Sequence, residues 1–151
     1  MKTIKLLTTL VLAGLLVVTF SSCKKYDEGG LVSKTEKNLK ETWTLQKYLR
    51  NGTDETSLLL IKNYEETYSG SDSYSRTYID KDNNNKSENG TWKFDKEQKK
   101  LNISGVGSIE ITDITGTVSS SYYNILKLDK SEFWYYYTNG GDRHEFHLSK
   151  K

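Results

Sequence analysis

The sequence has 151 residues and a formal net charge of +2 at neutral pH, with 22 lysines and arginines against 20 aspartates and glutamates. Loss of an N-terminal segment containing Lys2 and Lys5 would leave 20 charges of each sign, a balance that does not favour a nucleic-acid partner. Cys23 is the only cysteine, so an intramolecular disulfide is excluded and the fold depends on packing.

Residues 1–22 have the regions of a secretory signal peptide. Two lysines form a positive start, residues 6–20 carry no charge, and two serines precede Cys23. As a helix, the apolar run of about 15 residues would be about 22 Å long, short of the ~30 Å needed to span a bilayer. We therefore predict a cleaved leader over residues 1–22.

The segment Phe20-Ser21-Ser22-Cys23 resembles the lipobox of bacterial lipoproteins. The resemblance implies that the Cys23 thiol receives a diacylglyceryl group and that the leader is cut before this residue. Two or three acyl chains attach a protein stably to a membrane, whereas one chain binds only marginally. The alternative is a secreted protein with an incidental free thiol, which would be a liability in an oxidising compartment.

Residues 23–37 are polar and include Gly29 and Gly30, a composition that predicts a flexible tether. Within this tether, Asp27 and Glu28 closely follow two lysines, which resembles the export signal of surface lipoproteins of the Bacteroidota type. The resemblance implies a lipid anchor in the outer membrane of the cell envelope, with the protein either surface-exposed or periplasmic.

Residues 38–151 are expected to form one domain, because no proline or low-complexity block marks a further boundary. Tyrosine is frequent, with 11 in the chain, and β-branched residues alternate with polar ones, which is typical of strands. The alternating segments predict strands over residues 41–49, 57–68, 73–80, 90–95, 100–104, 108–115, 121–129, 132–138 and 143–149. The apolar run 58–61 has no clear period and could instead form a short helical turn.

Turn residues separate these segments at short intervals. Asn51-Gly52 suits a tight hairpin turn because both residues tolerate positive φ, and Asn139-Gly140-Gly141 joins the last two predicted strands. Hairpins in sequence order favour an up-and-down meander, and closing it removes exposed edges. The predicted fold is all-β: a small antiparallel up-and-down barrel or a curved half-barrel of about eight strands.

Segments 41–53, 89–104 and 122–138 resemble the lipocalin-like domains of Bacteroidota-type lipoproteins. In that family a G-x-W motif lets the first strand bend and places a tryptophan in the closed end of the barrel. Gly90-Thr91-Trp92 keeps this pattern, but the first strand has Glu41-Thr42-Trp43. The departure at Glu41 implies a flatter or more open barrel.

The resemblance also implies an arginine packed over that tryptophan, with Arg50 and Arg143 as the candidates by strand placement.

The strand over residues 133–137 is aromatic on both faces, which is unusual for a half-solvated sheet. Either it has one core face and tyrosine hydroxyls that reach solvent, or one face packs while the other lines a cavity or docking surface. Tyrosine suits a ligand site because it offers apolar area and a hydrogen bond. The predicted ligand-binding residues are Trp43, Leu45, Trp92, Phe94, Phe133, Trp134, Tyr135, Tyr136 and Tyr137.

No metal site or cofactor is predicted. His144 and His147 are three positions apart, so on a strand they point to opposite faces and cannot share a metal. His144 is expected to pack beside Phe146. Residues 80–88 have oxygen ligands at alternate positions like a calcium loop, but they lack its sixth-position glycine and twelfth-position glutamate, so a solvated hairpin loop is expected.

The sequence contains no G-x-S-x-G motif, no Cys-His pair and no phosphate-binding glycine loop, so no enzyme is predicted. The resemblance implies a membrane-tethered binding domain for a small apolar or amphipathic ligand. The alternative is an accessory envelope lipoprotein that docks a protein or glycan partner through an aromatic surface.

Overall fold

The computed structural model describes residues 35–112, 117–118 and 122–151. The predicted leader, Cys23 and residues 23–34 of the predicted tether lie outside these residues. Within the described part of the chain, no helix has both the length and the apolar character needed to cross a membrane.

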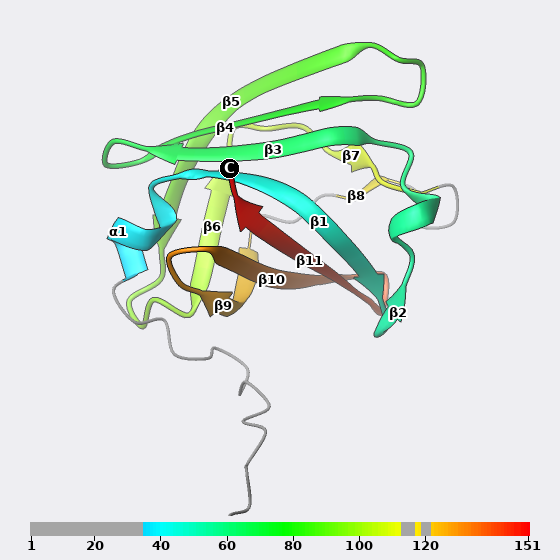
Figure 1. Ribbon diagram of the computed structural model, residues 1–151. Coiled ribbons are helices and arrows are strands. Elements are labelled where there is room, and N and C mark those ends of the chain that lie inside the picture. The colour runs from blue at the N-terminus through cyan, green and yellow to red at the C-terminus, as the bar shows by residue number, and fades with distance from the viewer. Residues whose placement is uncertain (1–34, 113–116, 119–121) are drawn as a thin grey trace, which may run out of the picture.

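The described chain is built almost entirely of strands (Figure 1). It has one short helix, α1 (Thr35–Leu39), and one 3-10 turn, η1 (Thr56–Leu58). The strands in chain order are β1 (Thr42–Arg50), β2 (Thr53–Asp54), β3 (Lys62–Ser69), β4 (Ser73–Ile79), β5 (Asn85–Phe94), β6 (Lys100–Ser104), β7 (Ile109–Glu110), β8 (Thr117–Val118), β9 (Tyr122–Leu128), β10 (Glu132–Asn139) and β11 (Asp142–Lys150).

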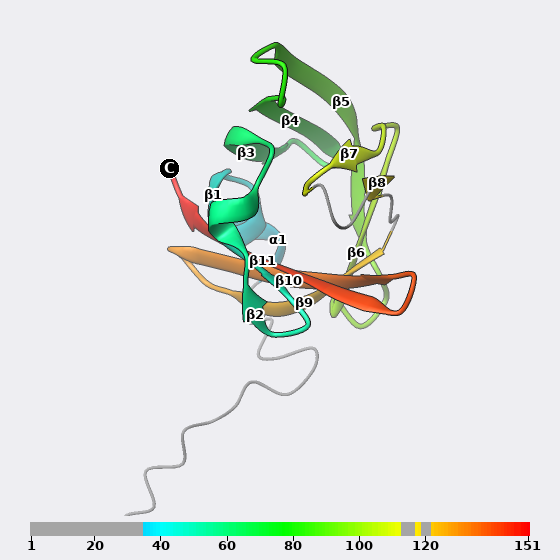
Figure 2. The ribbon, with the colours of Figure 1, turned by 90° about the vertical axis from the view of Figure 1, so that its right-hand side faces the viewer.

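Eight of these strands form a closed antiparallel barrel, which confirms the predicted fold class. They pair in the order β1, β3, β4, β5, β6, β9, β10, β11, and β11 then pairs with β1 to close the barrel. The short β2 pairs with the end of β1, while β7 and β8 form a separate two-stranded sheet. Figure 2 shows that small sheet beside the barrel strands, and Figure 1 shows it at the end away from α1.

The barrel is closed, so the expectation of a flatter or more open barrel was wrong. Leu45 pairs with Leu148 and Lys47 pairs with His147, which leaves Gln46 as an extra residue in β1. Such a β-bulge bends a strand and increases its twist. In the lipocalin-like family a glycine lets the first strand bend. Here the bulge at Gln46 allows β1 to bend instead.

Two predicted strands differ in the structure. The apolar run before β3 is not a strand: η1 ends at Leu58, β3 begins at Lys62, and Ile61 between them is buried. Of the segment predicted as a strand over 108–115, the described part forms only β7, which pairs with β8 and not with the barrel. The predicted turn at Asn51-Gly52 is confirmed. The two residues lie between β1 and β2 and have positive φ angles of 51° and 83°.

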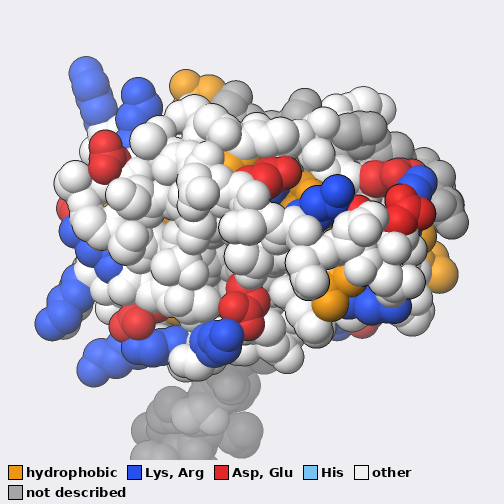
Figure 3. All heavy atoms as spheres, turned by 90° about the horizontal axis from the view of Figure 1, so that it is seen from above, with side chains coloured by type: hydrophobic (Ala, Val, Ile, Leu, Met, Phe, Trp, Pro, Cys, Tyr) orange, Lys and Arg blue, Asp and Glu red, His pale blue; other side chains and the backbone are white. Residues whose placement is uncertain are grey.

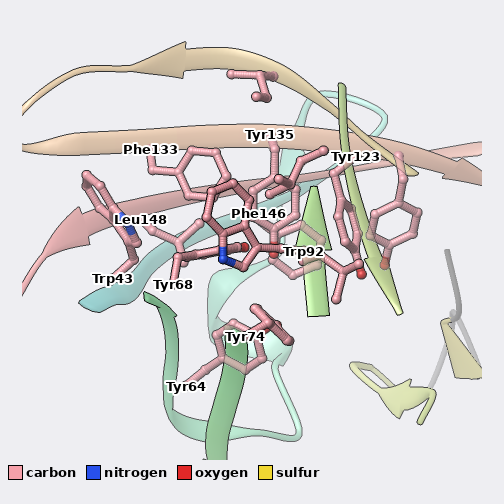
Figure 4. Close-up of a cluster of buried hydrophobic side chains, with 14 of the residues drawn as sticks. Trp43, Tyr64, Tyr68, Tyr74, Trp92, Tyr123, Phe133, Tyr135, Phe146 and Leu148 are labelled. Atoms are coloured by element: carbon pink, nitrogen blue, oxygen red, sulfur yellow. The ribbon is translucent and has the colours of Figure 1, made fainter. Parts of the chain in front are cut away.

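Trp43 fills the end of the barrel that α1 covers, hereafter the closed end. Its side chain is fully buried, its Nε1 donates to the Leu39 carbonyl at 3.0 Å, and its ring lies 5.7 Å from that of Phe133. Figure 4 shows Trp43 and Phe133 at the same end of the core. Neither candidate arginine covers this ring: Arg143 lies over Tyr136, and Arg50 bonds Glu55. That expectation was wrong because both arginines lie toward the opposite end.

Gly90 in β5 is required by a close approach of the chain. A Cβ atom at this position would lie 2.2 Å from the Ser104 carbonyl oxygen and 3.1 Å from the Val106 side chain. A Cβ atom on Gly105 would lie 3.2 Å from the Gly90 Cα, and Gly105 has a φ of +86°. The glycine of Gly90-Thr91-Trp92 therefore lets the segment after β6 fold against β5.

Replacing Gly90 with alanine is expected to lower the free energy of unfolding by roughly 1–3 kcal/mol, because the methyl group meets backbone that is fixed by strand pairing. Urea denaturation of the purified protein measures this change. Gly107→Ala is the matched control, since a Cβ there meets nothing closer than 3.5 Å. Equal stability of the two variants would contradict this account of Gly90.

Candidate ligand-binding site

The barrel interior is lined by tyrosines from several strands. Figure 4 shows side chains of β3, β4, β9 and β10 converging on one another. The buried tyrosines at inward positions are Tyr48, Tyr64, Tyr68, Tyr74, Tyr78, Tyr123, Tyr135 and Tyr137. An interior of this kind combines apolar ring surface with hydroxyl groups that need hydrogen-bond partners.

Glu66 on β3 is the centre of a buried hydrogen-bond cluster, and only 1% of it is exposed. Its Oε1 accepts from the hydroxyls of Tyr64 at 2.6 Å and Tyr135 at 2.7 Å, and its Oε2 accepts from Tyr68 at 2.6 Å. No lysine or arginine of the described residues forms an ion pair with it. Three short bonds from hydroxyl groups therefore solvate this carboxylate in place of water.

The tyrosines of this cluster stay neutral. Burial raises the pKa of Tyr64, Tyr68 and Tyr135 well above the ordinary value, and the negative charge of Glu66 raises it further. Each hydroxyl therefore remains a donor to Glu66 at physiological pH. Each also keeps lone pairs that can accept a further hydrogen bond.

The end of the barrel opposite α1, hereafter the mouth, is covered by residues 105–112 and by the segment around Leu60. The Leu60 amide donates to the Ile111 carbonyl at 2.9 Å, and the Arg76 guanidinium donates to the Gly107 carbonyl. Ile109 and Ile111 are buried. The covering segment is thus fixed to the barrel by hydrogen bonds as well as by apolar side chains.

Two arginines near the mouth are each paired with a carboxylate. Arg76 is 5% exposed and its Nε donates to Glu88 at 2.8 Å. Arg50 forms a forked pair with the buried Glu55, with Nη2 to Oε1 at 2.8 Å. Arg76 also lies directly opposite Glu66 in the pairing of β3 with β4. Burial raises the pKa of Tyr123 and Tyr137, and the positive charge of Arg76 acts on both in the opposite direction.

Tyr137 on β10 has a buried hydroxyl with no hydrogen-bond partner among the described residues. The residue is 2% exposed, and its ring is stacked on that of His144, with centroids 5.1 Å apart. The Nδ1 atom of His144 already bonds the Tyr48 hydroxyl at 2.8 Å. Tyr123 packs edge-on against Tyr137, with ring centroids 5.6 Å apart.

The outer face of β10 carries aromatic residues that are already in contact with charged neighbours. Trp134 is stacked on His147 at 4.0 Å, and the Lys127 ammonium lies 4.8 Å from the Trp134 ring. The Arg143 guanidinium lies 3.7 Å from the Tyr136 ring centre. On another side of the molecule, the surface above β3 to β5 has few hydrophobic side chains (Figure 3).

The structure divides the predicted ligand-binding residues between two faces. Trp43, Trp92, Phe133, Tyr135 and Tyr137 are buried in the barrel, with Leu45 and Phe94 partly buried against them. Trp134 and Tyr136 lie on the outer face, so the predicted residues do not form one site. As predicted, the two histidines also point to opposite faces, since His144 stacks on Tyr137 and His147 on Trp134.

Glu66, Arg76 and the tyrosines of β3 are not among the predicted ligand-binding residues. The available signal was Tyr64-x-Glu66-x-Tyr68, in which a carboxylate shares the period-2 face of two aromatic residues.

A surface concavity of about 570 Å³ lies outside the barrel, beside α1. It is lined by Glu36, Lys37, Lys40 and Glu41, and by none of the predicted ligand-binding residues. Its charged lining does not suit an apolar ligand.

The architecture is that of a lipocalin-like barrel, with eight antiparallel strands closed in up-and-down order around a buried interior. The sequence matches no family model and no curated protein.

Solved structures that are similar to this chain include the following three. Japanin from Rhipicephalus appendiculatus bound to cholesterol has a TM-score of 0.52 at 10% identity, over 74% of each chain. A lipocalin-like protein from Bacteroides uniformis has a TM-score of 0.49 at 13% identity, over 76% of this chain and 99% of its own. Lobster apocrustacyanin A1 has a TM-score of 0.44 at 16% identity, over 77% and 62%. The similarity to Japanin concerns the fold alone.

Stability is expected to fall as the pH drops below about 6.5, the ordinary pKa of histidine. Burial lowers the pKa of His144, so below that pH the unfolded chain takes up a proton that the folded chain does not. The His144-dependent loss is at most about 1.4 kcal/mol per pH unit.

Urea denaturation near pH 7.5 and near pH 5.5 tests this expectation. His144→Gln should remove part of the pH dependence, whereas His147→Gln on the outer face should retain it. The same pH dependence in wild type and His144→Gln would contradict the assignment.

Proposed function

We propose that this protein is a non-enzymatic binding protein that takes a small amphipathic ligand into the mouth half of its barrel. The observation that carries the proposal is the Tyr137 hydroxyl, which is buried without a partner among the described residues. A buried polar group left without a hydrogen bond costs about 1–3 kcal/mol. A polar group of a bound ligand would supply the missing bond.

Side chains already fill the closed half of the barrel, which limits where a ligand can lie. The Phe133 ring is 5.7 Å from Trp43 and 5.8 Å from Tyr68, distances that correspond to direct ring packing. The ligand would therefore contact Tyr123, Tyr137 and the residues that cover the mouth. Its apolar part would be buried against ring surface, and the hydroxyl would fix its orientation.

The Japanin structure, which has a similar fold, is described as bound to cholesterol. This supports an apolar or amphipathic ligand for the present fold. Its low sequence identity does not carry the identity of that ligand over to this protein.

The docking alternative has less support. It needs free aromatic surface on the outside of β10, but Trp134 is stacked on His147 and Tyr136 lies under Arg143.

We also propose that Cys23 carries lipid and anchors the protein to the outer membrane, on its surface or its periplasmic side. The lipobox-like segment and the Lys-Lys-x-Asp-Glu sequence after it support this placement.

Tyr137→Phe is expected to weaken ligand binding roughly tenfold, because it removes the hydroxyl that meets the polar group of the ligand. The same variant should be at least as stable as wild type, because the lost hydroxyl was buried without a partner. Isothermal titration calorimetry with alcohols, amines and carboxylates of matched short length measures the binding, and urea denaturation measures the stability.

Tyr136→Phe on the outer face is the matched control and should bind as wild type does. Absence of saturable binding for all these probes, or equal binding by Tyr137→Phe, would overturn the proposed function.

Cys23→Ser is expected to move the protein from the membrane fraction to the soluble fraction of cells that process bacterial lipoproteins. Mass spectrometry of the wild-type protein should show acyl chains on residue 23 and no residue before it. An unmodified Cys23 in such cells would show that the anchor proposal is wrong, without affecting the binding proposal.

A further inference from the structure

We propose that the covering segment, residues 105–112, opens to admit the ligand while the strands of the barrel stay paired. This inference rests on the proposed function and names how its binding site is reached.

In the closed arrangement the proposed site cannot be reached from solvent. Tyr137 is 2% exposed and its hydroxyl is buried, and Tyr123, which packs against it, is 8% exposed. A ligand group can therefore meet the Tyr137 hydroxyl only after some part of the protein has moved.

The barrel wall and the closed end are the parts that resist opening. Each of the eight barrel strands pairs with a neighbour on both sides, so parting two of them breaks several backbone hydrogen bonds at once. At the closed end, α1 covers Trp43, which is fully buried and donates to the Leu39 carbonyl. A movement that leaves these contacts intact has to take place at the mouth.

The covering segment is joined to the barrel differently from the strands of the wall. Its strand β7 pairs with β8 and, among the described residues, with no barrel strand. A two-stranded sheet by itself is only marginally stable. Figure 2 looks onto the mouth and shows β7 extending from the β5 side of the barrel toward β3. A segment held in this way opens at a lower free-energy cost than a strand inside a ladder.

Hydrogen bonds and apolar side chains hold the covering segment closed. The Leu60 amide donates to the Ile111 carbonyl at 2.9 Å, and the Arg76 guanidinium donates to the Gly107 carbonyl. Ile109 and Ile111 belong to the same buried cluster as the inward tyrosines. Ile111 thus contributes both a carbonyl and a side chain to closure.

Gly105 provides a position at which the segment can bend. It directly follows β6, which ends at Ser104, and its φ of +86° lies in a region that glycine adopts without strain. Hinges are a few loop or strand-end residues of this kind, often small ones. A rotation at Gly105 would move β7 and leave β6 in the wall.

Amide hydrogen exchange of the purified wild-type protein, followed by NMR, tests the opening without a ligand. After correction for intrinsic rates, the Leu60 amide is expected to exchange at least roughly 100-fold faster than the Ile125 amide, which donates to the Lys99 carbonyl at 2.8 Å. Equal protection of the two amides would mean that the covering segment opens only with the whole barrel, and it would overturn the inference.

Ile111→Ala is expected to speed exchange of the Leu60 amide roughly tenfold or more, because it removes a buried side chain that holds the segment closed. Stopped-flow fluorescence with 2-naphthol, an amphipathic alcohol, should show a similar rise in the association rate constant. The matched control is Leu128→Ala, which truncates a buried side chain near the closed end, beside Phe133. This variant should change neither rate by more than about threefold.

The outcomes separate the two proposals. If Ile111→Ala binds 2-naphthol no faster than the wild-type protein, or if both variants accelerate binding equally, the inference is wrong and the proposed function stands. If 2-naphthol binds neither the wild-type protein nor the variants, the proposed function fails, whereas the amide exchange still shows whether the covering segment opens.

Discussion

The pairing of β1 with β11 closes the sheet, and this contact determines the surroundings of every inward side chain. In an open sheet, the tyrosines of β3 and β10 could direct their hydroxyls to water. In the closed barrel they cannot, so each polar group inside needs a partner from another strand. Tyr135 reaches Glu66 from a strand 69 residues away in sequence, and Tyr48 reaches His144 across 96 residues. Closure of the barrel thus brings residues that are distant in sequence together in one hydrogen-bonded interior.

That interior is stabilised differently in its two halves. At the closed end, Trp43 and Phe133 pack as an apolar core, and the helix α1 supplies the carbonyl that the indole needs. Toward the mouth, carboxylates, arginines and tyrosines form paired polar groups. Satisfied polar networks of this kind are rigid, whereas a single unsatisfied member is unfavourable. The Tyr137 hydroxyl therefore stands out from the otherwise paired polar groups of the described residues, and it lies at an inward position.

Much of the fold could be predicted because its signals are local. Alternation and the turn residues at Asn51-Gly52 and Asn139-Gly140-Gly141 mark the strands, but the bulge at Gln46 could not be read, since it exists only in the register between β1 and β11. The candidate site was harder to predict for the same reason, because its contacts depend on how distant strands pair. Alternation places Glu66 on the face of Tyr64 and Tyr68 and Glu65 on the other face, but the bond from Tyr135 to Glu66 exists only in the closed barrel. In β10 every position from 133 to 137 is aromatic, so alternation could not assign Trp134 to the outside.

The proposed anchor and the proposed ligand are physically compatible. Thr35, the first residue of α1, follows Cys23 by 12 residues, which span roughly 40 Å when fully extended. Because α1 covers the closed end, a chain held at Cys23 would be attached on the side of the barrel away from its mouth. The mouth could then face the aqueous phase. A fatty ligand would have to leave the bilayer and travel around the barrel, whereas an amphipathic ligand that is soluble in water could enter directly from it. The buried hydroxyl of Tyr137 and the proposed placement of the N-terminus thus favour the same kind of ligand, one with a polar group.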